Sequence, residues 1–288
     1  MSPSTRDRLA TPLLATAAVV ATAVLLLIVA FLLRESQPAL EAVGLARFAF
    51  DPSWHPAAAA EAGHFNLMPM VAGSLLAALG AVLIAAPLGL LCAVFCADYA
   101  PRPLASTFRA VLHLLAGVPS VVYGLWGLVV LVPMIRALAP PGPSLLAASL
   151  ILALMILPTV AVLADAALAA VPRELRQAAA ALGLSRGRTV WSVVVPTARG
   201  GIAGGVLLAG GRAIGETLAV LMVCGNVVQV PDSVFDPVRT LTANIALEMA
   251  YATGDHRAAL FVSGLALAAV VSLLVWAAQG LERSAAHA

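Results

Sequence analysis

The stretch GGRAIGETLAVLMVCGN, residues 210–226, places two fully charged residue types within a run that is otherwise apolar or small. Arg212 and Glu216 are four residues apart, so on one continuous helix they share a face and can pair with each other. A charged side chain at the centre of a membrane-spanning helix costs about 2.5–3.5 kcal/mol. Two such costs need an offset, and we expect the helix either to line the path of an anion or to bury this ion pair against a neighbour.

The composition of the whole chain indicates a membrane protein. Of its 288 residues, 62% are hydrophobic and 10% are charged, and the mean hydropathy is +1.01. These values exclude an ordinary soluble domain.

Six segments are long and apolar enough to cross the hydrocarbon core of a bilayer. They are residues 10–33, 70–97, 107–138, 144–168, 198–224 and 258–280. Gly117 and Pro119 should bend or break the third of them. We predict an all-α, polytopic membrane protein with about six transmembrane helices, in which residues 1–288 form a single transmembrane domain.

The arginines indicate how the spans are oriented. If the N-terminus is cytoplasmic, ten arginines lie in cytoplasmic segments and five on the opposite side. Positively charged residues are enriched on the cytoplasmic side of membrane proteins. We therefore expect both termini, and the polar loop of about residues 172–197, to lie in the cytoplasm. Asp165 then lies near the cytoplasmic end of the fourth span, where we expect it to be solvated.

Several classes of function are disfavoured by what the sequence lacks. All 16 basic residues are arginine, whereas a Walker A loop needs a lysine that reaches the nucleotide phosphates. No pattern of a nucleophile with its base is found. The cysteines Cys92, Cys96 and Cys224 have no histidine at metal-ligand spacing, and we expect them to be packing residues. We therefore expect no catalytic residue, no metal site and no cofactor bound by this chain, and a membrane-embedded enzyme is disfavoured.

The loop between the fourth and fifth spans, VPRELRQAAAALGLSRGRTVWSVVVP at residues 171–196, has the pattern of a short amphipathic helix. Leu175, Ala178, Ala179 and Leu182 recur at i, i+3, i+4 and i+7, which places them on one face. Gly183 can end the helix in the left-handed conformation. Such a helix could dock on another protein or rest on lipid headgroups.

The spacing within this loop resembles that of a known family. Gln177, Ala178 and Ala179 are followed by three residues, Gly183, nine residues and a segment that ends in Pro196. This arrangement resembles the EAA loop of ABC importer permeases, although Gln177 stands where that family has glutamate. The resemblance implies a coupling helix between the fourth and fifth spans. The resemblance also implies that Gln177, Ala178, Ala179, Gly183 and Pro196 of this loop contact an ATP-hydrolysing subunit.

Further motifs extend the resemblance over nearly the whole chain. They are FDPSWHP at residues 50–56, GVPSVVYGLWGL at 117–128, LILALMILPT at 150–159 and the stretch at 210–226. Together they resemble phosphate ABC transporter permeases of the PstC type. The resemblance implies a permease subunit of an ATP-driven importer that translocates inorganic phosphate across the cytoplasmic (inner) membrane of a bacterium. It also implies a sister permease, two subunits that bind ATP and Mg, and a periplasmic phosphate-binding protein as partners.

Other functions remain open at this point. The chain could be the sister, PstA-type permease, or it could transport another oxyanion such as sulfate or phosphonate. An ion-coupled secondary transporter, driven through Glu216, would need no ATPase partner. Folds of that class often contain internal repeats and more spans, and neither is found in this sequence. Retention of an ATPase partner during purification distinguishes the two classes.

Five residues are candidates for the path of the anion. Arg212 suits phosphate because its planar guanidinium offers two parallel donors and keeps its charge. Glu216 could accept a proton from the phosphate, or it could hold Arg212 between transport steps. Thr217 is a possible additional donor. Ser120 and Tyr123 could face the same cavity, although a tyrosine near a membrane interface is more often an anchor.

Overall fold

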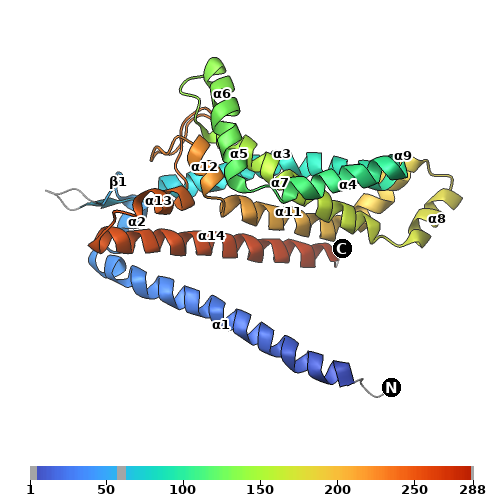
Figure 1. Ribbon diagram of the computed structural model, residues 1–288, viewed down its shortest axis with the longest axis horizontal. Coiled ribbons are helices and arrows are strands. Elements are labelled where there is room, and N and C mark those ends of the chain that lie inside the picture. The colour runs from blue at the N-terminus through green and yellow to red at the C-terminus, as the bar shows by residue number, and fades with distance from the viewer. Residues whose placement is uncertain (1–4, 57–62, 287–288) are drawn as a thin grey trace. The chain divides into compact units, whose positions relative to one another are not determined.

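The computed structural model describes residues 5–56 and 63–286, which are almost entirely helical (Figure 1). Five of the described helices are long and apolar enough to span a membrane, or six if one bent pair of helices is counted as a span. The predicted all-α, multi-pass architecture is therefore confirmed. The chain divides into two compact units, residues 1–66 with 248–266 and residues 67–247 with 267–288.

The smaller unit combines a long apolar helix with two short strands. Its elements are α1 (Thr5–Ala42), α2 (Arg47–Phe50), β1 (Trp54–His55), β2 (His64–Phe65) and the beginning of α14 (Gly254–Ala286). The strands pair antiparallel, with Trp54 opposite Phe65, and they were not predicted from the sequence. The apolar side chains of α1 are mostly exposed, as expected of a helix that lipid surrounds.

The larger unit contains the remaining helices. Its elements are α3 (Met68–Val94), η1 (Phe95–Tyr99), α4 (Arg102–Ala116), α5 (Ser120–Trp126), η2 (Gly127–Leu131), α6 (Val132–Leu138), α7 (Leu145–Ala169), α8 (Arg173–Ala181), α9 (Arg186–Thr189), η3 (Val190–Val194), α10 (Val195–Thr197), α11 (Arg199–Ile214), α12 (Leu218–Val223) and α13 (Leu241–Glu248), followed by the end of α14. The three η elements are π-helical turns, which often occur at functional sites.

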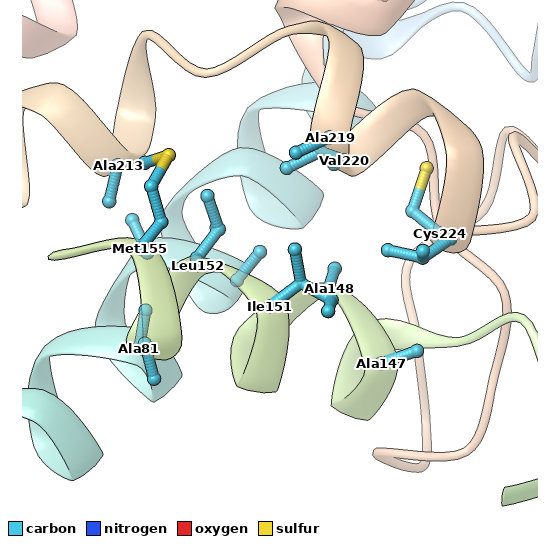
Figure 2. Packing of buried hydrophobic residues seen from close by; sticks show 14 of the residues in the cluster. Ala81, Ala147, Ala148, Ile151, Leu152, Met155, Ala213, Ala219, Val220 and Cys224 are labelled. Carbon is cyan, nitrogen blue, oxygen red and sulfur yellow. The ribbon is translucent and has the colours of Figure 1, made fainter. Parts of the chain in front are cut away.

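The core of the larger unit is built around α7. In Figure 2 the side chains of Ile151, Leu152 and Met155 on this helix point toward α11 and α12, which contribute Ala213 and Val220. The helix begins at a regular cap, since the Ser144 hydroxyl accepts a hydrogen bond from the amide of Ala147 at 3.3 Å. This central helix fixes where α3, α11 and α12 can lie.

Small residues allow α3 and α11 to approach α7 closely. At four glycines of these two helices an added Cβ would come within 2.5–2.8 Å of an α7 side chain, closer than real Cβ contacts. They are Gly80 and Gly89 on α3, and Gly201 and Gly205 on α11. Close approach through small residues is the usual way in which membrane helices pack, because lipid supplies no hydrophobic driving force between them.

The third predicted span, residues 107–138, is not one kinked helix. α4 ends at Ala116, and the spanning helix runs separately over Ser120–Leu138. Pro119 causes the break because it has no amide to donate and disfavours the helical conformation in the residue before it. The break lies where the sequence predicts it, but it separates two elements.

The fifth predicted span, residues 198–224, is also discontinuous. α11 ends at Ile214 and α12 begins at Leu218, so residues 215–217 connect two helices. Before α11, the helical segment Arg186–Thr197 meets Arg199–Ile214 at a bend of 68°. The prediction that one continuous helix carries both charged residues is therefore wrong.

Candidate transport pathway and coupling helix

The break after α11 changes the relation between the two charged residues. Arg212 lies in the last turn of α11 with an exposed side chain, whereas Glu216 lies beyond the helix end and is half-buried. Within residues 5–56 and 63–286, no ion pair joins the two side chains. The alternative of a buried ion pair over one helical turn is therefore wrong, because the helix stops before Glu216.

Glu216 instead binds the neighbouring backbone. Its Oε1 accepts a hydrogen bond from the amide of Ala219 at 3.1 Å, in the first turn of α12. A carboxylate in this position is favourable because the first amides of a helix have no partner within the helix. The carbonyl of Glu216 accepts a hydrogen bond from the hydroxyl of Thr242 at 2.8 Å. Glu216 therefore stabilises the start of α12, and it does not neutralise Arg212.

α5, which carries the predicted pathway residue Tyr123, packs against α12. An added Cβ on Gly124 would lie 2.8 Å from the Cα of Ala219, so α5 lies directly against α12. The Tyr123 hydroxyl, one residue earlier, donates to the carbonyl of Leu115 at 2.9 Å. The fold thus places the helix of Tyr123 against α12, which begins just after Arg212 and the break.

The two remaining predicted pathway residues, Ser120 and Thr217, lie on α5 and in the connection between α11 and α12. Ser120 begins α5 three residues before Tyr123, which puts both on the same face of that helix, and it is half-buried. Thr217 lies in the connection beside Glu216, and its hydroxyl is 3.5 Å from the carbonyl of Gly215. That distance is too long for a strong hydrogen bond. The Thr217 hydroxyl is therefore only weakly held.

The predicted coupling helix is α8, and it ends as the sequence indicates. Gly183 has a φ of +73°, in the left-handed region. The amide of Leu184 donates to the carbonyl of Ala179 at 3.1 Å, and the amide of Gly183 donates to the carbonyl of Ala180 at 3.0 Å. These two bonds form a Schellman motif, which satisfies carbonyls at the end of the helix and reverses the chain.

Most of the coupling segment is exposed. α8 lies beyond one end of α7 and α11 (Figure 1). Leu182 is 82% exposed and Leu175 is 39% exposed, and exposed apolar side chains on a projecting segment are typical of docking surfaces. Of the five predicted coupling residues only Ala179 is buried; those exposed are Gln177, Ala178, Gly183 and Pro196.

Both regions lie within one stretch that matches a known family. Residues 85–287 match the family described as binding-protein-dependent transport system inner membrane component. The chain belongs to this family. The match includes α5, α11 and α12 with the predicted pathway residues, and α8 with the predicted coupling residues.

Named relatives of this inner membrane component are transport permeases. The chain is 35% identical over 250 residues to the phosphate transport system permease protein PstC of Mesorhizobium japonicum, covering 79% of this chain and 75% of the relative. It is 42% identical over 191 residues to the probable ABC transporter permease protein YqgH of Bacillus subtilis, covering 66% and 62%. The expected membership in the ABC importer permeases is therefore confirmed.

A solved structure has the same fold as this chain. The chain resembles one chain of a bacterial alginate ABC transporter in complex with an alginate pentasaccharide-bound periplasmic protein. The TM-score is 0.63 and the sequence identity is 14%, with 96% of each chain covered. At this level of identity the likeness concerns the fold alone.

This permease also holds buried polar residues near Glu216 that were not predicted. Thr242, which binds the Glu216 carbonyl, and Asn244 are both buried. Arg239 donates from Nε to the carbonyl of Asn226 at 2.9 Å and from a terminal nitrogen to Oδ1 of Asn244 at 3.1 Å. The run RTLTAN at residues 239–244 interleaves polar with apolar residues. That signal could have identified them.

Proposed function

We propose that this chain is the permease subunit of an ATP-driven importer that translocates inorganic phosphate across the cytoplasmic membrane. The observation that carries the proposal is the exposed Arg212 at a broken membrane helix, in a chain whose relatives include phosphate transport permeases. An arginine within the membrane is a functional candidate because it is costly to place there without a partner.

The chemistry of Arg212 suits a phosphate oxyanion. Its planar guanidinium can donate two parallel hydrogen bonds to two oxygens, and it stays charged at any physiological pH. Because the Glu216 carboxylate accepts a hydrogen bond from the start of α12 and forms no ion pair with Arg212, the charge of Arg212 is available to an anion. Tyr123 and Ser120 on α5, and Thr217 beside the break, can add hydroxyl groups along the same route. A path with one strong cation also permits release, which conduction requires.

Energy for transport would come from partner subunits that dock on α8. The exposed Leu182 and the residues Gln177, Ala178, Gly183 and Pro196 form the docking surface, and ATP and Mg are bound by the partners. Two such ATP-binding subunits, a sister permease and a periplasmic phosphate-binding protein complete the importer. In this arrangement α8 and both chain termini lie in the cytoplasm.

Uptake of radiolabelled phosphate by the reconstituted complex, with sulfate as competitor, tests the proposal. Arg212→Ala should lower uptake per assembled complex by about 10–100-fold, because each hydrogen bond to a charged group contributes about 1.5–3 kcal/mol. Arg212→Lys should recover part of the uptake, because a point charge lacks the two-donor geometry.

Arg136→Ala is the matched control, because Arg136 is an exposed arginine near the end of α6. This variant should transport normally. Normal uptake by Arg212→Ala would contradict the role of Arg212. Purification without an ATP-binding partner, together with uptake driven by an ion gradient, would contradict the importer itself.

A further inference from the structure

Two arginine–carboxylate pairs lie at the end of the larger unit that carries α8. Arg176 of α8 pairs with Asp98 of η1. Arg109 of α4 binds Asp165 of α7 through two hydrogen bonds of 2.7 and 2.9 Å. The carboxylate side chains are 8% and 17% exposed, respectively. Asp165, expected to be solvated, is thus held by an arginine.

Each of these arginines also reaches the backbone of a third element. A terminal nitrogen of Arg176 donates to the carbonyl of Leu168 on α7 at 3.2 Å. A terminal nitrogen of Arg109 donates to the carbonyl of Cys96 in η1 at 3.3 Å. Arg176 therefore ties α8 to η1 and α7, and Arg109 ties α4 to the same two elements.

The π-helical turn η1 is where these links meet. Besides Asp98 and the Cys96 carbonyl, it presents the ring of Tyr99, which lies 5.6 Å below the guanidinium of Arg186 from α9. Three elements at this end of the larger unit, α4, α8 and α9, thus contact the one turn that follows α3. A π-helical turn interrupts the regular ladder of an α-helix, so it is a natural place for α3 to change its direction.

The buried negative charge of Asp98 is compensated by the guanidinium of Arg176. One carboxylate oxygen of Asp98 faces Arg176, and the other is buried without a hydrogen bond partner among the described residues. A buried charge that loses its partner is strongly unfavourable, so Asp98 and Arg176 should move together. Movement of α8 would then pull directly on η1.

We propose that Asp98 and Arg176, supported by Arg109 and Asp165, form a transmission joint that carries the movement of α8 into α3 and α7. These are positioning residues, since they act through the helices that they hold. The inference rests on the proposed docking of an ATP-binding subunit on α8. It adds the route by which that docking reaches the membrane-spanning helices.

The test is the number of phosphate ions taken up per ATP hydrolysed, measured on the complete complex in proteoliposomes. Asp98→Asn should lower this ratio about tenfold, while the amount of assembled complex and the rate of ATP hydrolysis stay near those of the wild type. The double variant Asp98→Asn with Arg176→Gln should recover only part of the ratio. Its two neutral side chains can still hydrogen-bond with each other, but glutamine lacks the planar fork that also reaches Leu168.

Two further variants sharpen the result. Arg102→Gln is the matched control, because Arg102 is an exposed arginine at the start of α4; its ratio should equal that of the wild type. Arg176→Lys keeps the charge opposite Asp98 but lacks the planar fork that also reaches Leu168. It should assemble normally and couple less efficiently, which provides a test even if Asp98→Asn fails to fold.

The outcomes separate this inference from the proposed function. Less assembled complex with an unchanged ratio in Asp98→Asn and Arg176→Lys would mean that the pair only stabilises the fold, and would overturn the transmission joint. A normal ratio with normal assembly would overturn it as well. A wild-type chain that binds no ATP-binding subunit would overturn the proposed function, and the joint with it.

Discussion

At the scale of single residues, Gly183 has a left-handed backbone conformation, although there is room around it for a side chain. Its φ is +73°, yet an added Cβ would meet nothing within 4 Å. A substitution there is therefore opposed by the backbone angle alone. Branched side chains resist the left-handed region most strongly, whereas asparagine tolerates it.

This difference gives a prediction for the coupling helix. Gly183→Val should destabilise the end of α8 by about 1–3 kcal/mol and lower the fraction of permease that retains its ATP-binding subunits on purification. Gly183→Asn, the matched control, should retain them nearly as well as the wild type. Equal retention by the two variants would show that the Schellman motif does not position the docking surface.

The two most informative residue positions differ in how far the sequence predicts them. Gly183 is predictable because the end of α8 depends on residues within one turn of it. The relation of Arg212 to Glu216 is not, because it depends on where α11 stops. The hydroxyl that binds the Glu216 carbonyl belongs to Thr242, 26 residues further along the chain. A pattern read along one helix cannot include that contact.

At the scale of elements, the segment between α1 and α3 is organised around one carboxylate. Asp51 receives hydrogen bonds from the side chain of Arg47 at 3.1 Å and from the amide of Phe65 at 2.9 Å. Burial alone would raise the pKa of Asp51. The bonds from Arg47 and Phe65, together with the positive charge of Arg47, hold the pKa below its ordinary value. The short strands were not predictable because each is two residues long.

The lowered pKa of Asp51 makes this segment sensitive to acid. Since the folded pKa lies below the unfolded value of about 3.9, the stabilisation is complete above that value and is lost as the pH falls through the folded pKa. We expect Trp54, which is 4% exposed and pairs with Phe65, to become solvated over this range. In Asp51→Asn the segment between α1 and α3 should already be less stable at neutral pH, and it should not lose this part of its stability when the pH falls.

Fluorescence of Trp54 measures this opening when the other tryptophans are replaced by phenylalanine. Those others are Trp126, Trp191 and Trp276. Trp54 also donates to Glu248, and Glu248 binds His256. They are the same in the two proteins, so the difference between the titration curves reports Asp51. Identical curves would contradict its role.

At the scale of the whole molecule, the membrane class and the apolar runs follow from the composition of the chain. The breaks between helices do not: the break at Pro119 is predictable from one residue, and the end of α11 was not predicted. The apolar runs define where helices can cross, but Pro119 and the end of α11 divide two of them. Composition is a sum over many residues, whereas a break depends on one proline or on a contact from a distant segment. The orientation of the spans remains a prediction from the arginines.

Labelling from outside the cell tests that orientation. Arg188 and Asp232 are both exposed, and cysteines introduced at these positions should react with an impermeant thiol reagent from opposite sides of the membrane. We expect labelling at position 232 in intact cells and at position 188 only after permeabilisation. For this experiment the three native cysteines, Cys92, Cys96 and Cys224, are first replaced by alanine so that only the introduced cysteine can react. Labelling of position 188 in intact cells, with or without labelling of position 232, would contradict the predicted topology.

The π-helical turn at Phe95–Tyr99 also bears on how the length of this chain can change during evolution. Each residue turns an α-helix by about 100°, and a π-helical turn holds more residues than an α-helical one. Loss of one residue here would restore a regular helix and swing Asp98 about the helix axis, away from Arg176. The side chains of the turn that make no such contact can therefore be exchanged, but an insertion or deletion there breaks the register between Asp98 and Arg176.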